Sequence, residues 1–335
     1  MSLSIIIVNY RSASFILNCL ESAFSFQSSA NFEWIIVDND SKDNSQQIIT
    51  DTFPAVRWIN MGYNAGFARA NNEGIRQSKG EVVLLLNPDT LIIDDAVAVC
   101  YKRMREDESC IAAATQLLNA DKTFQITGNF FIKGSLNSLL PLPYMGKFLR
   151  TIALIGGIKK TNVKQASYTE RVDWINGAFL MVKKTAIEKA GMLDEDFFLY
   201  FEETEWCSRL NKQGRLIVYG DIFTTHLQGE TINTATNSLD KGYFNLYDKK
   251  GLQLMVSSLV RIRKQFGIGW SFFHLLMLLI EIPVFFICSI VQHLFSFKNP
   301  FSEWDKISGY TINVCRVLRL SPGIIANKPH FYKMF

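Results

Sequence analysis

The chain has 335 residues, a formal net charge of +4, and 48% hydrophobic residues. This length fits one large domain or two smaller ones, with enough apolar content for a substantial core. The mild charge argues against a nucleic-acid-binding protein, which usually has a strongly basic face. The six cysteines include no C-x-x-C pair, so we expect free thiols in a reducing compartment and no zinc site.

Short apolar runs alternate with helical patterns through the first third of the chain. The predicted strands are 3–9, 33–38, 56–60, 81–87 and 110–115, and the predicted helices are 13–27, 43–51, 66–78 and 93–106. Nearly continuous apolar strands are typical of a sheet covered on both faces. The order predicts an α/β fold with a Rossmann-like, mostly parallel, right-handed wound sheet. The first run is short and β-branched and lacks signal-peptide flanks, so we expect a buried strand and a cytosolic catalytic part.

Polar residues follow three of these strands, where ligands of such sheets bind. They are Asn9 with Tyr10, Asp38 with its neighbours, and Asn87 to Asp89. Asp89 can hold Mg²⁺ or Mn²⁺, although Asn-Pro-Asp is also good turn chemistry. Asp38 can accept hydrogen bonds from a nucleobase or ribose, although the stretch that follows also offers helix N-caps.

The predicted helix 66–78 contains residues that are poor helix formers. Asn71 and its neighbour Asn72 lie in its middle, which suggests a polar task such as contact with a ligand. Asn64 precedes the helix and is also a candidate cap. Arg69 faces either a phosphate or solvent, and the sequence favours neither.

Residues 128–170 are irregular and predict a long loop or flap, partly helical. Strand character returns at 172–184 and at 215–220. His226 follows the second of these strands. A lone histidine is most often a packed or surface residue, so a functional role depends on whether its strand end joins Asp89.

Three glutamates follow a run of large apolar residues at the start of a predicted helix. A helix dipole is sufficient to explain Glu202, and Glu205 forms an i, i+4 pair with Arg209. Glu203 has neither explanation. Its aromatic neighbours should desolvate it and raise its pKa, which suits a general base.

The C-terminal region, 236–335, is predicted to be helical. Its segment 270–295 is long enough to span a bilayer. At about 100° per residue its polar residues fall on one stripe, and basic residues, including "RIRK" at 261–264, lie on both sides. We therefore favour an in-plane or re-entrant membrane helix over a span, with a core helix of a second domain as the alternative.

Six stretches of the chain, in order, together resemble glycosyltransferase family 2, the inverting GT-A class, in its rhamnosyltransferase-like branch of bacterial polysaccharide assembly. They are "SIIIVNY", "VDNDSKD", "NAGFARANNEG", "LLLNPDT", "NGAFLMVKK" and "LDEDFFLYFEETEWCSRL", with His226 after them. They cover roughly residues 1–230, and the remainder of the chain carries no such motif.

The resemblance implies a nucleotide-sugar and acceptor domain over 1–235 that uses a divalent metal, Mg²⁺ or Mn²⁺, held by Asp89 and His226. The acidic motif of relatives is usually Glu-Asp-x-Asp with its second acid as the base, which here is Glu203, with Glu202 as the fallback. The implied donor-binding residues are Val8, Asn9, Tyr10, Asp38, Asn64, Arg69, Asn71 and Asn87. The expected acceptor-binding residues are Trp174, Asn176, Gly177, Tyr200 and Glu205.

The resemblance also implies transfer of a sugar, with dTDP-rhamnose as the favoured donor, onto a lipid-linked saccharide at the cytoplasmic face of a bacterial plasma membrane. A UDP-hexose or UDP-galactofuranose donor is the alternative within the class. A sugar-phosphate nucleotidyltransferase would carry a Gly-rich basic loop near its start, which "IIIVNYRSAS" lacks. A non-catalytic membrane scaffold is the alternative outside enzymes, and a homo-oligomer is left open.

Overall fold

The computed structural model describes residues 3–227 and 245–335, which divide into two compact units. The N-terminal unit comprises Met1–Phe130, Thr161–Phe198 and Glu202–Ile232, and the C-terminal unit comprises Phe131–Lys160, Leu199–Phe201 and Asn233–Phe335. The predicted boundary at 235 lies outside the described residues. The predicted division placed the whole irregular segment in the N-terminal domain. In the structure, residues 131–160 of that segment belong to the C-terminal unit.

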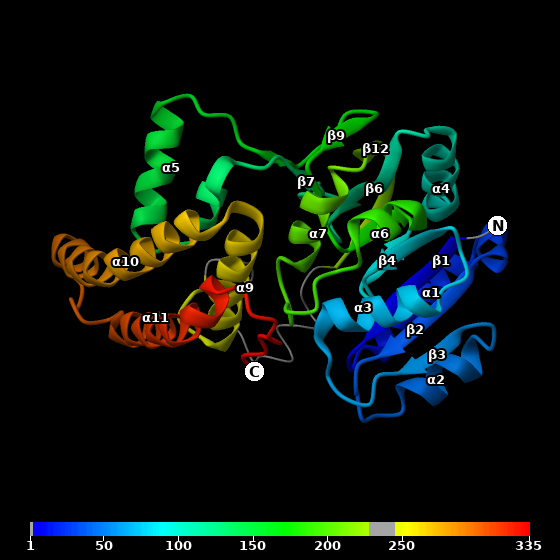
Figure 1. Ribbon diagram of the computed structural model, residues 1–335, viewed down its shortest axis with the longest axis horizontal. Coiled ribbons are helices and arrows are strands. Elements are labelled where there is room, and N and C mark those ends of the chain that lie inside the picture. The colour runs from blue at the N-terminus through cyan, green and yellow to red at the C-terminus, as the bar shows by residue number, and fades with distance from the viewer. Residues whose placement is uncertain (1–2, 228–244) are drawn as a thin grey trace. The chain divides into compact units, whose positions relative to one another are not determined.

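The N-terminal unit is built on a curled sheet with helices around it (Figure 1). Its strands follow the order β3-β2-β1-β4-β11-β6-β12-β5, with β9 beside β12. They are β1 Leu3–Asn9, β2 Glu33–Asp38, β3 Arg57–Asn60, β4 Val82–Leu86, β5 Thr90–Ile92, β6 Cys110–Leu118, β9 Glu170–Val172, β11 Phe179–Lys183 and β12 Arg215–His226. Its helices are α1 Ala13–Phe24, η1 Gln27–Asn31, α2 Ser45–Thr52, α3 Gly66–Gln77, α4 Ala96–Glu106, α6 Lys184–Ala190 and α7 Glu202–Leu210.

The direction of the strands changes after β4. From β3 to β4 every neighbouring pair is parallel, as the alternating pattern predicts. β11 then runs antiparallel to both β4 and β6, while β12 is parallel to β6 and antiparallel to β5 and β9. The sheet is therefore of the mixed α/β type. The ends of β1, β2, β4, β6 and β12 still point to one common edge.

The poor helix formers of α3 have structural tasks. A Cβ on Gly74 would lie 2.5 Å from Cγ2 of Ile6, so glycine allows α3 to approach β1 closely. The buried amide of Asn72 donates to the Leu193 carbonyl at 2.9 Å and accepts from the Leu193 N–H at 3.1 Å. Asn71 donates to the carbonyl of Phe67, one turn earlier in the helix, at 2.9 Å. These internal contacts explain the mid-helix asparagines without a ligand, and the ligand contact predicted for them stays a prediction.

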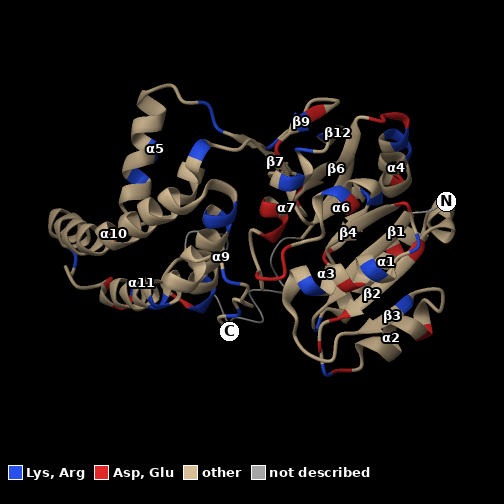
Figure 2. Ribbon diagram, viewed as in Figure 1, with Lys and Arg blue, Asp and Glu red and all other residues tan. Residues whose placement is uncertain are grey.

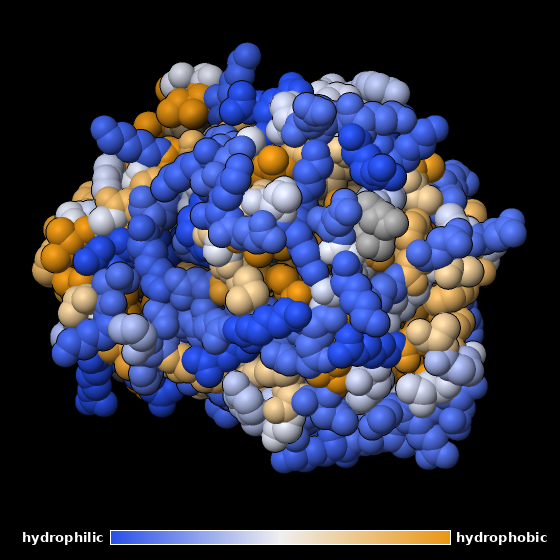
Figure 3. Space-filling view, turned by 45° about the vertical axis from the view of Figure 1, so that its right-hand side comes forward, coloured by the Kyte–Doolittle hydropathy of each residue, from blue (hydrophilic) through white to orange (hydrophobic). Residues whose placement is uncertain are grey.

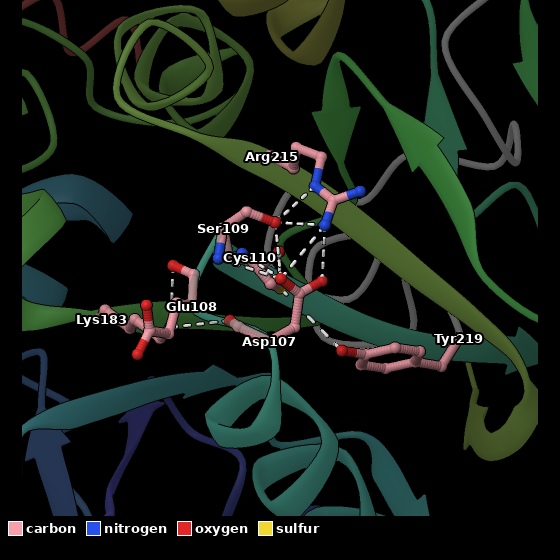
Figure 4. A network of polar contacts seen from close by, with 8 residues as sticks. Asp107, Glu108, Ser109, Cys110, Lys183, Arg215 and Tyr219 are labelled. Atoms are coloured by element: carbon pink, nitrogen blue, oxygen red, sulfur yellow. Dashed lines mark hydrogen bonds and ion pairs between the residues drawn. The ribbon is translucent and has the colours of Figure 1, made fainter.

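A polar cluster ties the starts of β6 and β12 together (Figure 4). Asp107 and Arg215 form an ion pair at 2.9 Å, and the Lys183 ammonium donates to the Asp107 carbonyl at 3.0 Å. Because β6 and β12 are parallel, this cluster lies at the edge of the sheet opposite to the strand ends. Its position indicates a structural role.

A second, small sheet has the order β10-β7-β8, formed by β10 Trp174–Ile175, β7 Gly128–Asn129 and β8 Asn162–Val163. The C-terminal unit is helical, as predicted. It contains η2 Lys133–Leu139, α5 Met145–Ile155, α9 Lys249–Phe266, α10 Ile268–Phe295 and α11 Trp304–Ile325. The three long helices α9, α10 and α11 pack on one another. Among the described helices, α10 alone is long and apolar enough to cross a membrane, which by itself is weak evidence that it does.

Candidate functional site

The ends of β1 and β2 hold a half-buried carboxylate in a fixed position. Asn9 and Asp38 are opposite each other in the parallel ladder. The Asn9 amide is fully buried and donates to Asp38 at 2.8 Å and to the Ser41 hydroxyl at 3.0 Å. The Ser41 N–H donates to the other Asp38 oxygen at 3.2 Å. Asp38 therefore reaches the surface with its orientation set, while Asn9 serves as its support.

The loop before α3 is closed by two asparagines. Asn39 accepts from the Ala65 N–H at 2.7 Å, and Asn64 accepts from the Gly66 N–H at 3.2 Å. Gly66 has a φ of 72°, and a Cβ there would lie 2.2 Å from the Phe198 carbonyl oxygen. Only glycine fits this approach. The N-cap residue of α3 is Ala65 and carries no side-chain cap, so the contact of Asn64 is a local turn and the capping alternative is not met. The donor contact predicted for Asn64 stays a prediction.

His226 lies beside Asp89. β12 extends beyond the predicted 215–220, because a bulge between Tyr219 and Phe223 carries the strand on to His226. The imidazole Nε2 is 3.4 Å from Asp89 Oδ1 and 3.3 Å from the Asn87 amide nitrogen. Both Asp89 and His226 are buried. The structure thereby meets the condition under which we expected His226 to be functional.

The amide of Gln125 sets the tautomer of His226. Its nitrogen donates to the His226 carbonyl at 2.5 Å, which turns its oxygen toward Nδ1 at 3.0 Å. In the neutral imidazole that oxygen accepts from Nδ1–H, which leaves the Nε2 lone pair facing Asn87 and Asp89. Gln125 lies between the predicted strand 110–115 and the irregular segment 128–170, where no sequence pattern pointed to it.

Asp89 and His226 suit a divalent cation. A carboxylate oxygen and an imidazole lone pair attract each other only through a positive charge between them, and both are accepted ligands of Mn²⁺ or Mg²⁺. Within residues 3–227 and 245–335, no group of three or more Asp, Glu, His or Cys residues could hold a metal. A cation here would take its other ligands from a bound diphosphate and water.

The acidic residues at the start of α7 differ in burial (Figure 2 shows them in red). Glu202 is buried, and its Oε2 has no hydrogen-bond partner in the described part of the chain. Burial, with the neighbouring charge of Glu203, raises the pKa of Glu202 well above its usual range. Glu203 is half-buried. This contrast favours Glu203 over Glu202 as the acid that reaches a substrate.

The start of β11 connects Glu203 to the strand end that carries Asn87 and Asp89. The Cγ of Glu203 would be 3.4 Å from a Cβ placed on Gly177, so this glycine leaves room for the glutamate. The next carbonyl, that of Ala178, accepts from the Asn87 N–H at 3.0 Å. A short path of contacts thus joins Glu203 to Asn87 and Asp89. Just before α7, Tyr200 and Phe201 have φ of 71° and 69°, a strained pair of left-handed residues that sets the direction of the helix start.

The predicted acceptor residues are placed as follows. α7 packs on β10, which contains Trp174. The indole nitrogen of Trp174 is buried without a partner among the described residues, while Asn176 bonds to the Ile126 carbonyl at 3.3 Å and the Ala178 N–H at 2.9 Å. Tyr200 is buried. Of these, Trp174 retains a donor that a ligand could satisfy.

Two of the predicted ligand-binding residues, Asn71 and Glu205, are buried and already bonded within the protein. Asn71, predicted to bind the donor, is buried with its amide bonded inside α3. Glu205, predicted to bind the acceptor, is buried in a 2.7 Å ion pair with Arg209, which confirms the helix pair expected from their spacing. Arg69 donates to the Glu195 carbonyl at 3.1 Å, a contact that neither interpretation anticipated. The donor roles of Val8, Tyr10 and Asn87 stay predictions.

We expect Glu202→Gln to stabilise the protein at neutral pH. The raised pKa means that the folded state keeps a proton which the unfolded state releases above about pH 4.3, so wild-type stability falls with rising pH at about 1.4 kcal/mol per pH unit until the folded pKa. The glutamine has no proton to lose. Urea unfolding at pH 4, 6 and 8 should therefore show a gain for the variant at pH 8 that shrinks at pH 4.

Glu205→Gln is the matched control for this prediction. It removes a buried carboxylate that is paired with Arg209, so it should destabilise the protein at all three pH values. A Glu202→Gln protein that is less stable than wild type at pH 8 would show that Glu202 is charged in the folded state.

Comparison with known proteins gives the following. Residues 4–159 match the family described as Glycosyl transferase family 2. The "Low-salt glycan biosynthesis hexosyltransferase Agl10" of Haloferax volcanii is 30% identical over 217 residues, 63% of this chain and 62% of that protein. The N-acetylglucosaminyl-diphospho-decaprenol L-rhamnosyltransferase of Mycobacterium tuberculosis is 28% identical over 198 residues, 55% of this chain and 62% of that protein. The chain thus spans less than two thirds of the length of both relatives.

Among solved structures, a mannosyltransferase of Pyrobaculum calidifontis in complex with GDP-Man and Mn²⁺ resembles the chain with a TM-score of 0.47 and 13% identity. The likeness covers 97% of this chain and 87% of that one.

Proposed function

We propose that this chain, which belongs to glycosyl transferase family 2 through residues 4–159, is an inverting glycosyltransferase of glycan assembly. The proposal rests on a path of contacts at the ends of the strands. Glu203 lies beside Gly177, and the neighbouring Ala178 is hydrogen-bonded to Asn87. The Asn87 side chain in turn contacts His226, which lies beside Asp89. A base and a metal-ligand pair on one edge suit transfer of a sugar from a nucleoside diphosphate to a hydroxyl group.

The donor would bind along the ends of β1, β2 and β4. Asp38 is held by Asn9 and Ser41 with its carboxylate facing outward, so it would accept hydrogen bonds from the base or ribose. Asp89 and the Nε2 of His226 would hold a divalent cation, Mg²⁺ or Mn²⁺, which supplies charge neutralisation for the diphosphate. Gln125 keeps the Nε2 lone pair available for this purpose.

Glu203 would act as the general base. Its carboxylate takes the proton of an acceptor hydroxyl as that oxygen forms a bond to the anomeric carbon. The bond from that carbon to the diphosphate breaks on the opposite side, and the leaving nucleoside diphosphate takes the electron pair. One displacement through an oxocarbenium-like state inverts the anomeric centre. Burial raises the pKa of Glu202 and favours its neutral form, in which it adds no second negative charge beside the base.

The donor sugar and acceptor form the finer part of the proposal. We propose rhamnosyl transfer from dTDP-rhamnose onto a lipid-linked saccharide at the cytoplasmic face of the plasma membrane. A relative named L-rhamnosyltransferase, with a polyprenyl diphosphate in its name, supports both parts. A UDP-hexose or UDP-galactofuranose donor is the alternative, supported by the relative named hexosyltransferase.

Calorimetric binding of dTDP, UDP and GDP, each with and without Mn²⁺, tests the proposal. We expect Mn²⁺-dependent binding of dTDP in preference to the other two, because the proposed cation links the diphosphate to Asp89. A preference for UDP would keep the reaction and replace the sugar. Binding of none of the three would overturn the enzyme proposal in favour of a non-catalytic scaffold.

A further inference from the structure

Helix α10 has its polar residues inside and its apolar residues outside. Its stripe of Ser271, His274, Glu281 and Ser289 is buried within the C-terminal unit. The opposite face exposes large hydrophobic side chains along its whole length. They are Ile268, Phe272, Leu276, Leu279, Ile280, Phe286, Ile287, Val291, Leu294 and Phe295. A water-facing helix has the reverse arrangement, so this face requires an apolar partner.

Helix α5 and the residues that follow it also expose large apolar side chains. Phe148 is 65% exposed and Ile155 83%, and Ile152, Leu154 and Ile158 are also exposed. Within α5 itself, only Gly146 is buried. In Figure 1 the lower end of α5 lies next to α10, and the space-filling view in Figure 3 shows hydrophobic residues at its left margin among other places. An eleven-residue helix with so little support from its own unit also requires a partner.

The two helices are joined by a buried carboxylate. Both oxygens of Glu281, in the middle of α10, accept hydrogen bonds from the N-terminus of α5, from the Tyr144 N–H at 2.7 Å and the Met145 N–H at 3.0 Å. The Tyr144 hydroxyl donates to Gln292 at 2.9 Å, and its ring packs on Phe285. The only acidic residue of α10 therefore caps α5 and does not lie on the exposed face of α10.

The segment that carries α5 has charges of one sign. Residues 131–160 contain Lys133, Lys147, Arg150, Lys159 and Lys160 and no Asp or Glu. Lys147 and the pair Lys159 and Lys160 are exposed beside the apolar side chains of α5. Figure 2 shows basic residues on α5. Within the basic stretch 261–264, Arg261 is buried and Arg263 bonds to the Ile325 carbonyl at 2.7 Å, so these two arginines are not placed for headgroup contact.

We propose that α5 and the outward face of α10 form one surface that inserts into a single leaflet of an anionic phospholipid membrane. Apolar side chains would enter the acyl region, and the lysines of 147–160 would lie at the headgroups. A second copy of this chain fits less well, because a two-fold contact would place these basic residues against one another. The inference deepens the membrane-facing part of the proposed function and is independent of the transfer reaction.

The packing of α10 favours an orientation in the membrane plane. The Tyr310 hydroxyl of α11 donates to the Leu278 carbonyl at 3.0 Å, which fixes α11 against the middle of α10. α11 exposes Arg316 and Arg319. If α10 crossed the bilayer, these arginines would be drawn toward its apolar interior, which is costly. An in-plane helix keeps α11 on the water side.

Vesicle flotation tests the surface. Wild-type protein should float with vesicles of phosphatidylcholine and phosphatidylglycerol and much less with phosphatidylcholine alone, and salt should weaken the binding. Phe148→Ser, Ile152→Ser and Ile155→Ser together should reduce binding by roughly tenfold or more. The control Val99→Ser, at an exposed position on α4, should not change it.

Two outcomes would overturn this inference. One is equal flotation of the triple variant and wild type. The other is no flotation of wild type while light scattering shows a dimer that the triple variant loses, which would assign the surface to a second copy. Nucleotide binding by the same preparations reports the proposed function separately, so either proposal can fail alone.

The depth of three positions tests the orientation. Single cysteines at Ile268, Ile280 and Phe295, in a background with Cys288 and Cys315 replaced by serine, would carry a fluorophore that is quenched by spin-labelled lipids. In-plane insertion predicts similar shallow depths at all three. A position 280 near the bilayer centre, with the other two at opposite interfaces, would contradict the in-plane arrangement.

Discussion

Glu203→Gln is expected to lower kcat by about 10²- to 10⁴-fold, the range that a positioned general base contributes. The substitution keeps the size of the side chain and its place beside Gly177, and removes only the ability to accept a proton. Donor binding should be unchanged, since the donor residues lie at other strand ends. Steady-state transfer assays with a soluble lipid-linked analogue, combined with calorimetric binding of the nucleotide, separate the two effects.

Glu202→Gln is the matched control for this prediction. Burial raises the pKa of Glu202 and favours its neutral form, so its replacement by glutamine should change kcat only slightly. A large loss in Glu202→Gln with near-normal turnover in Glu203→Gln would reverse the assignment and make the buried glutamate the base. The pH profile adds a further readout, because the acidic limb of kcat should disappear with the true base.

The strands and the polar clusters at their ends could be predicted because both signals are local. The continuous apolar runs specify β1, β2 and β4, and a strand end in a parallel sheet fixes where the next polar residue lies. Asp38 and Asp89 were identified in this way. β12 was predicted too short, because Gly220 and Asp221 suggest a turn, whereas the structure places a bulge there and the strand continues to His226.

Contacts between distant residues could not be predicted from one sequence. The partner of Asn72 is Leu193, and the partner of His226 is Gln125, each about a hundred residues away. An asparagine inside a helix indicates that its side-chain amide has a hydrogen-bond partner. The sequence does not show whether that partner is a ligand or a distant backbone group. For this reason the sequence assigned Asn71 and Asn72 to a ligand, and it gave no signal for Gln125.

Asp89→Asn is expected to reduce Mn²⁺-dependent nucleotide binding by more than about 100-fold, since loss of outer-shell partners alone costs 10- to 100-fold in metal sites. The amide retains the shape of the side chain and removes its negative charge, so the His226 lone pair would be left without a carboxylate partner for the cation. Calorimetry with and without Mn²⁺ measures this directly. Transfer activity should fall to background.

Two further variants test whether the expected loss of Mn²⁺-dependent nucleotide binding is specific to the proposed metal ligands. Asp94→Asn is the same substitution at an exposed position and should change nothing. Gln125→Leu removes the acceptor that holds Nδ1–H, so Nε2 is no longer reserved for the metal, and we expect an intermediate loss of about 10- to 100-fold in Mn²⁺ affinity. Asp89→Asn with unchanged Mn²⁺ dependence would place the cation elsewhere or remove it from the reaction. The graded order of Asp89, Gln125 and Asp94 follows only if the carboxylate and the oriented imidazole bind the same ion.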